Sequence, residues 1–165
     1  MSTAVRTLVT IIFGLGLLLV VLPWQLLRLE EKTSLRLGIV AAYGGGLLFL
    51  TGIGLAFSGT YYLIHRGGGT LWPLVPPRRL VVAGPYAHVQ HPIWLGLWFA
   101  ICGEALWVQS VLLALYVVFV MILANLYVKT IEEPRLGHRY GADYQAYRAA
   151  VPRWFPFRRR RAPSR

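Results

Sequence analysis

The chain of 165 residues is poor in cysteine and in charge. Its single cysteine, Cys102, lies in an apolar stretch, so no intramolecular disulfide is possible and we expect a small buried side chain. Only 14% of the residues are charged, whereas 56% are hydrophobic and the mean hydropathy is +0.55. The length predicts one domain, and the composition excludes a soluble globular protein.

Acidic residues are also scarce, because 6 Asp and Glu stand against 17 Lys and Arg, which gives a formal net charge of +11. Such a charge also suits nucleic-acid binding. Here, however, the basic residues flank apolar stretches and gather at the C-terminus, which favours a membrane surface over nucleic acid as the partner. We expect the run from Arg158 to Arg161 to contact anionic lipid headgroups. The sequence predicts no metal site and does not indicate an oligomeric state.

Long apolar stretches dominate the remaining sequence. Residues 7–27 are long enough to cross a bilayer. A cleaved signal peptide is the competing interpretation, but no small-residue cleavage site follows Val21, so we expect a retained helix. Residues 37–64 form a second apolar stretch, and we expect its glycines to let a neighbouring helix approach closely.

Residues 93–131 are apolar but too long for one membrane helix. A turn at Gly103-Glu104, or at Val108-Gln109-Ser110, would divide them into a helical hairpin. Beyond them, Tyr144 and Tyr147 share one face of a helix, as in an amphipathic segment on a membrane surface. The sequence therefore predicts an all-α integral membrane protein with about four transmembrane helices, the last two a hairpin, and a cytoplasmic amphipathic C-terminal helix. The positions of the arginines place both termini in the cytoplasm.

Two polar stretches carry the residues suited to chemistry. The first runs from Gly84 to Gly96 and contains Pro92, which suits the first position of a helix. The unpaired N–H groups at that helix end would attract an anion, beside the side chains of Tyr86, His88 and His91. A membrane-surface loop with ordinary interfacial aromatic residues is the alternative.

The second polar stretch is the acidic pair Glu132-Glu133, where an apolar stretch meets water. Adjacent carboxylates are costly to desolvate at that depth, so a ligand diol or a cation is a suitable partner. A solvated helix end is the alternative interpretation.

The two polar stretches and the residues after them contain a series of short sequence blocks: Gly84-Pro85-Tyr86, His91-Pro92, Gly96, Glu132-Glu133, Tyr140-Gly141, Tyr144, Tyr147 and Val151-Pro152-Arg153-Trp154. In order and spacing, these blocks resemble the isoprenylcysteine carboxyl methyltransferase family, with bacterial members closest, and the related phospholipid N-methyltransferases share the first two blocks. The resemblance covers roughly residues 65–157.

The resemblance implies an enzyme of the inner membrane that transfers a methyl group from S-adenosylmethionine to a lipid or hydrophobic small-molecule acceptor. We expect one membrane domain, residues 1–165, in which 1–64 form two transmembrane helices and 65–165 form the cofactor-binding catalytic half that the resemblance implies. The positions that it assigns to the cofactor are Leu80, Val81, Tyr86, His91, Pro92, Ile93, Trp94 and Glu132. We expect Gln90, Lys129 and Arg153 near the acceptor, and His88 or Glu133 as the proton acceptor if one is needed.

The sequence departs from the isoprenylcysteine enzymes at two positions where they carry arginine. These positions are Gln90 and Val128, although Lys129 is adjacent to the second. Those arginines suit a substrate carboxylate, so their loss weakens the case for carboxyl methylation and leaves another acceptor open. Two further classes remain: an NADPH-dependent membrane reductase, for which Arg78-Arg79 would bind the 2′-phosphate, and a non-catalytic membrane subunit.

Overall fold

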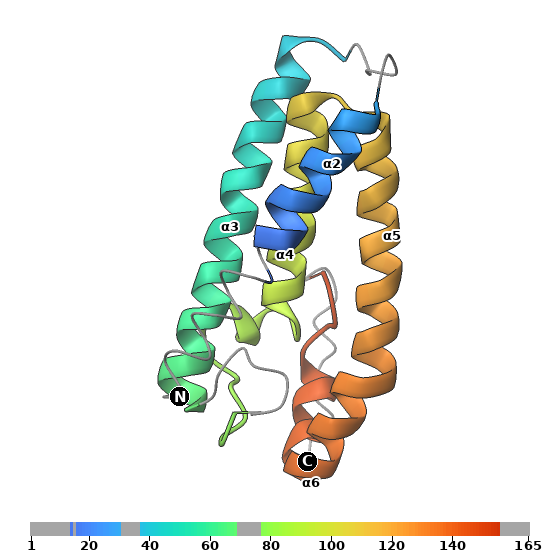
Figure 1. Ribbon diagram of the computed structural model, residues 1–165. Helices are drawn as coiled ribbons and strands as arrows, with labels where there is room; N and C mark the ends of the chain where they lie inside the picture. The colour runs from blue at the N-terminus through green and yellow to red at the C-terminus, as the bar shows by residue number, and fades with distance from the viewer. Residues whose placement is uncertain (1–13, 15, 31–36, 69–76, 156–165) are drawn as a thin grey trace, which may run out of the picture.

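The structure, a computed structural model, describes residues 14, 16–30, 37–68 and 77–155. Every regular element within these residues is a helix (Figure 1). In chain order the elements are η2 (Leu17–Val21), α2 (Leu22–Leu29), α3 (Ile39–Gly67), η3 (Gly84–Ala87), α4 (Pro92–Val108), α5 (Val111–Tyr127), η4 (Val128–Glu132) and α6 (Glu133–Ala150). The predicted all-α class is confirmed.

Two helices of the described chain are long and apolar enough to cross a membrane. They are α3, with 29 residues, and the continuous helix formed by α5, η4 and α6, with 40 residues. The segments Leu17–Leu29 and Pro92–Val108 are apolar but shorter. Two of the four predicted spans therefore have the required length and composition, and the count of four stays a prediction. The first half of the predicted span 7–27 lies mostly outside the described residues.

The hairpin turn between α4 and α5 lies at Gln109 and Ser110, the second of the two predicted places. Gln109 adopts the left-handed conformation with φ 58°, and the Ser110 side chain caps α5 by accepting from the Leu113 N–H. The Glu30 carboxylate accepts from the Ser110 hydroxyl and, at 3.0 Å, from the Val111 N–H. These bonds attach the end of α2 to the hairpin.

Helices α3 and α4 run side by side because glycines remove the side chains between them (Figure 1). A Cβ atom on Gly96 would lie 2.6 Å from the Gly52 carbonyl oxygen, and one on Gly103 would lie 2.6 Å from the Gly45 carbonyl oxygen. The predicted close approach is therefore found, and it involves backbone against backbone. On its other side α4 packs against α5 through a core that includes Trp98, Ile101, Leu113 and Val117, and α2 packs against α5.

Helix α6 continues from α5 but bends at Gly141, whose φ of 53° and ψ of −124° interrupt the helix. The chain then leaves α6 at Val151 and returns to the start of α4, where the Gln90 N–H donates to the Pro152 carbonyl at 3.0 Å. Tyr144 and Tyr147 do lie on one helix face, and both are buried within the protein. The amphipathic, membrane-surface character of this helix stays a prediction.

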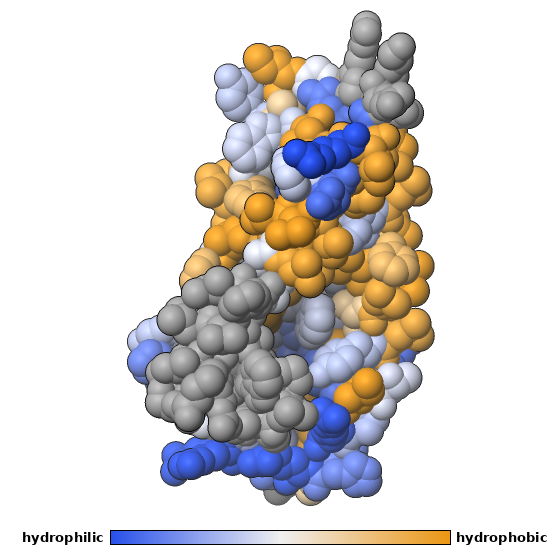
Figure 2. Space-filling model, viewed as in Figure 1, coloured by the Kyte–Doolittle hydropathy of each residue, from blue (hydrophilic) through white to orange (hydrophobic). Residues whose placement is uncertain are grey.

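The surface of the protein has an apolar part and a polar part. Figure 2 shows a hydrophobic band around the middle of the helices and hydrophilic residues at the end formed by α6. The start of α4, the end of α3 and α6 all lie at that end (Figure 1). The residues with chemical potential are therefore gathered where an apolar bundle meets a polar layer.

Candidate functional site

The site is built on the first turn of α4. Pro92 is the first helical residue, as predicted, and His91 precedes it as the N-cap. The first bond of this helix runs from the Leu95 N–H to the His91 carbonyl at 3.1 Å. The N–H groups of Ile93 and Trp94 come earlier in the turn and so have no carbonyl partner within the helix.

Glu132, the last residue of η4, contacts the start of α4 from the other arm of the α4–α5 hairpin. Its carboxylate accepts from the Trp94 indole N–H at 3.1 Å and lies 3.1 Å from His91 Nδ1. The Trp94 ring also contacts the ring of Tyr127, with centroids 5.9 Å apart. The structure thus brings together four predicted cofactor residues, His91, Pro92, Trp94 and Glu132, from two distant parts of the sequence.

His91 lies between both carboxylates of the acidic pair. Its Nε2 is 3.9 Å from a Glu133 oxygen, and the ring packs against Trp154. Burial on its own would lower the pKa of His91, but the hydrogen bond to Glu132 and the nearby negative charge of Glu133 outweigh it and raise the pKa above the ordinary 6.5. The imidazole is therefore held toward its protonated form.

Glu133 is buried and paired with two arginines. Its carboxylate lies 2.5 Å from Arg153 Nε, accepts from Arg153 Nη2 at 2.8 Å, and lies 3.4 Å from Arg148 Nη2. Burial alone would raise the pKa of Glu133, but the nearby His91, the bond from Arg153 and the charges of Arg153 and Arg148 lower it to about 2. Glu133 therefore stays ionised at neutral pH and ties the C-terminal segment to α6.

The other predicted cofactor residues lie around this centre. Tyr86 is buried, and its carbonyl accepts from the Tyr147 hydroxyl at 2.8 Å. Burial and the Glu132 charge raise the pKa of the Tyr86 hydroxyl, so it stays protonated. Val81 is buried beside Gly67 at the end of α3, Leu80 is half-buried, and Ile93 packs toward Gly59.

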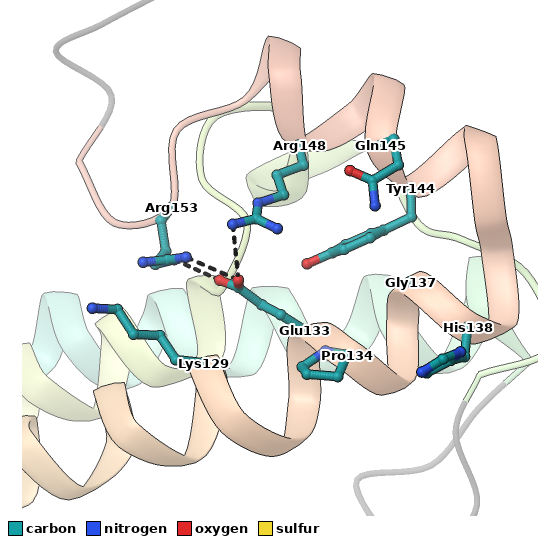
Figure 3. Close-up of a pocket in the computed structure, with 9 residues that line it drawn as sticks. All are labelled: Lys129, Glu133, Pro134, Gly137, His138, Tyr144, Gln145, Arg148 and Arg153. Atoms are coloured by element: carbon teal, nitrogen blue, oxygen red, sulfur yellow. Dashed lines mark hydrogen bonds and ion pairs between the residues drawn. The ribbon is translucent and has the colours of Figure 1, made fainter.

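Of the predicted acceptor residues, Lys129 and Arg153 lie together beside Glu133, whereas Gln90 and the predicted base His88 have other partners. Gln90 is buried, and its side-chain amide donates to the Val151 carbonyl at 2.5 Å. His88 is exposed, and its Nδ1 lies 3.3 Å from the Gly84 carbonyl. Lys129 is exposed beside the Glu133–Arg153 pair (Figure 3). The catalytic and acceptor roles of these residues stay predictions.

An open pocket of about 640 Å³ lies next to Glu133 (Figure 3). Cationic side chains of Lys129, Arg148 and Arg153 surround it, and Tyr144 directs its hydroxyl toward the Glu133 carboxylate. Pro134, Gly137, His138 and Gln145 complete the lining. Sequence analysis did not identify Arg148, although it lies one helical turn after Tyr144 and therefore on the same face.

Comparison with known proteins bears on this geometry. The model of the phospholipid methyltransferase family matches residues 40–143, which is more than half of the chain. Among curated proteins and solved structures, none matches the chain. The match includes the Gly84–Gly96 stretch and the acidic pair, and it indicates a membrane methyltransferase for a lipid-type substrate. The chain therefore belongs to the phospholipid methyltransferase family.

Proposed function

We propose that the protein transfers a methyl group from S-adenosylmethionine to a lipid or hydrophobic acceptor at the cytoplasmic face of the inner membrane. One observation carries the proposal: a carboxylate, a free helix start and two aromatic rings converge at the first turn of α4. Family membership supports the methyltransferase activity.

The residues at this turn fit the chemical groups of S-adenosylmethionine. The Glu132 side chain is 30% exposed, and only part of its lone pairs are used by His91 and Trp94, so it can accept from a ribose diol. The N–H groups of Ile93 and Trp94 suit the methionine carboxylate. The faces of Trp94 and Tyr127 suit a sulfonium cation.

When bound, S-adenosylmethionine supplies an electrophilic methyl group. What the chain itself contributes is position, because a helix start and a doubly hydrogen-bonded carboxylate would hold the cofactor at two points and so fix the direction of its methyl group. The contact between His91 and Glu132 orients that carboxylate.

The surroundings of Gln90 and Val128 argue for an acceptor other than a prenylated cysteine. Both residues are buried, and the Gln90 amide is occupied by the carbonyls of Val151 and Arg148. An arginine at either position would have to enter the protein interior. This agrees with a phospholipid-type acceptor, which needs no clamp for a cysteine carboxylate.

An amine or hydroxyl acceptor must lose a proton. The two predicted bases, Glu133 and His88, differ in how readily they can accept it. Glu133, with a pKa of about 2 and two arginine partners, is a weak base at neutral pH. His88 is exposed and has no ion pair among the described residues. We therefore favour His88.

Thermal unfolding of the detergent-purified chain tests the proposal. S-adenosylhomocysteine should raise the apparent melting temperature in a concentration-dependent way, because a ligand that binds only the folded state stabilises it. NADP should have no effect. Stabilisation by NADP alone would overturn the proposal in favour of a reductase, and radiolabelled methyl transfer into a total lipid extract would identify the acceptor.

A further inference from the structure

The basic pocket beside Glu133 adjoins the first turn of α4, since Glu133 lies 3.9 Å from His91, but its lining includes none of the residues proposed above to hold the cofactor. Three cationic side chains, Lys129, Arg148 and Arg153, face one carboxylate there. The balance is positive by two charges. A pocket with this balance, at the polar end of a membrane protein, attracts an anion.

We propose that this pocket binds the phosphate group of the acceptor phospholipid and thereby holds the headgroup near the methyl-transfer site. The inference rests on the proposed function, since it assigns a place to the acceptor of that reaction. What it adds is a place for the phosphate on this chain, at Lys129, Arg148 and Tyr144.

The cationic side chains keep donors available after pairing with Glu133. Arg153 donates to that carboxylate through Nη2 and directs its Nε toward it, which leaves at least three of its five N–H groups. Arg148 contacts Glu133 only at 3.4 Å, and its side chain is 46% exposed. Arg148 can therefore turn toward a ligand while Arg153 still neutralises Glu133. Lys129 is exposed and forms no ion pair with any described residue.

Tyr144 supplies an independent observation. The residue is 1% exposed, and among the described residues its hydroxyl has no hydrogen-bond partner. A buried hydroxyl without a partner is costly, so such groups are usually satisfied by a ligand or water. Figure 3 shows this hydroxyl directed into the pocket beside Arg148. A phosphate oxygen would accept from it.

The outer face of α5 explains how a lipid would reach the pocket. Leu115, Phe119, Ile122 and Leu126 follow one another at helical spacing, and all are about half exposed or more. Lys129 comes one turn after Leu126, at the end of this apolar face. Acyl chains lying along α5 would therefore place their phosphate at Lys129, directly after the apolar helix α5.

Calorimetric titration of the full chain in detergent tests the inference with dihexanoyl phosphatidylethanolamine as the probe. Lys129→Gln should weaken its binding about tenfold, because a charge-assisted bond is lost, and Tyr144→Phe should weaken it about threefold. Arg66→Gln, which removes an exposed cation at the end of α3, is the matched control and should bind like the parent.

Three further ligands separate the possible sources of the effect. Dihexanoylglycerol, which lacks the phosphate, should bind the parent and Lys129→Gln alike. Inorganic phosphate should compete with the phospholipid in the parent, and much less in Lys129→Gln. S-adenosylhomocysteine should bind parent and variants equally, so its failure to bind the parent would count against the proposed function and not against this pocket.

The inference is wrong if Lys129→Gln and the parent bind the phospholipid equally, or if Arg66→Gln loses as much affinity. It is also wrong if Lys129→Gln weakens S-adenosylhomocysteine instead of the phospholipid, because the pocket would then belong to the cofactor. Binding of inorganic phosphate without binding of the phospholipid would show an anion site unrelated to the acceptor.

Discussion

Two neighbouring glutamates of this chain have different surroundings and therefore different tasks. Glu132 is partly exposed and holds the start of α4 through His91 and Trp94. Glu133 is buried and holds the C-terminal segment through Arg153 and Arg148. One residue of offset on a helix is enough to turn the two side chains toward different partners.

The first prediction concerns this pair. Glu132→Gln should weaken S-adenosylhomocysteine binding about tenfold or more, because a charge-assisted hydrogen bond to the ligand becomes a neutral one. Glu133→Gln should change that affinity less but should lower the free energy of unfolding by about 3 kcal/mol. This is the lower end expected for a broken buried pair, since both arginines are partly exposed.

Calorimetric titration and thermal unfolding of both variants give the two readouts side by side. Equal losses of ligand affinity in Glu132→Gln and Glu133→Gln would contradict the division of tasks.

The second prediction concerns His91 and pH. Its pKa is raised above 6.5, so the folded chain holds this proton more tightly than the unfolded chain does. The stabilisation is fully present below pH 6.5 and is lost as the pH rises through the folded-state pKa. The melting temperature of the parent should therefore fall as the pH rises above neutrality, and His91→Gln should show a flatter profile.

His88→Gln is the matched control for this experiment, because His88 is exposed and lies outside the acidic pair. It should keep the slope of the parent. If the parent and His91→Gln show parallel profiles across this range, the protonated imidazole does not stabilise the fold.

At the scale of elements, the contact between α3 and α4 depends on which glycines face the partner helix. Gly45, Gly52 and Gly59 lie at intervals of seven residues, and a Cβ on each would clash with the α4 hairpin arm. Gly44, Gly46 and Gly54 on the same helix have nothing within 4 Å of such a Cβ. Only the first set serves close packing.

The third prediction follows from this division. Gly52→Ala should destabilise the fold by about 1 to 3 kcal/mol, because the new methyl group would force the two backbones apart. Gly54→Ala adds the same methyl group in open space and should leave stability unchanged or slightly raised. Unfolding of both variants in one detergent decides the question, and similar melting temperatures for the two would show that the helices are not held by this face.

At the scale of the whole molecule, the two ends of the bundle differ in charge. Within the described chain, Arg66, Arg78, Arg79 and the arginines of α6 lie at the end that carries the site, whereas the α4–α5 turn lies at the other (Figure 1). The rule that basic segments stay in the cytoplasm then predicts that the site faces the cytoplasm. The predicted positions of both termini lie outside the described residues.

The fourth prediction is this orientation. In a Cys102→Ser background, a cysteine at Asp143 on α6 should react with an impermeant maleimide only after the cells are permeabilised. A cysteine at Val108, beside the hairpin turn, should react in intact cells. The reverse labelling pattern would overturn the orientation and with it the cytoplasmic face assigned to the reaction.

The helices and their order along the chain follow from local features of the sequence. Apolar runs long enough for a bilayer, Pro92 at a helix start and the Val151-Pro152 stop are local features, so the helix that begins at Pro92 and the end of α6 were predictable. The choice between two hairpin turns was not, because it depended on whether Gly103 met solvent or another helix. The structure packs it against α3.

Which polar side chains contact one another depends on the tertiary structure. His91 and Glu132 were singled out from the sequence, but their contact across 41 positions arises from the antiparallel hairpin. Gln90 was expected near the acceptor, yet it binds the backbone after α6, because the chain returns there and its carbonyls need donors. The basic pocket needs Lys129, Arg148 and Arg153 from three segments. Hydrophobic patterning specifies which faces are buried, whereas the pairing of charges depends on which ends the folded helices bring together.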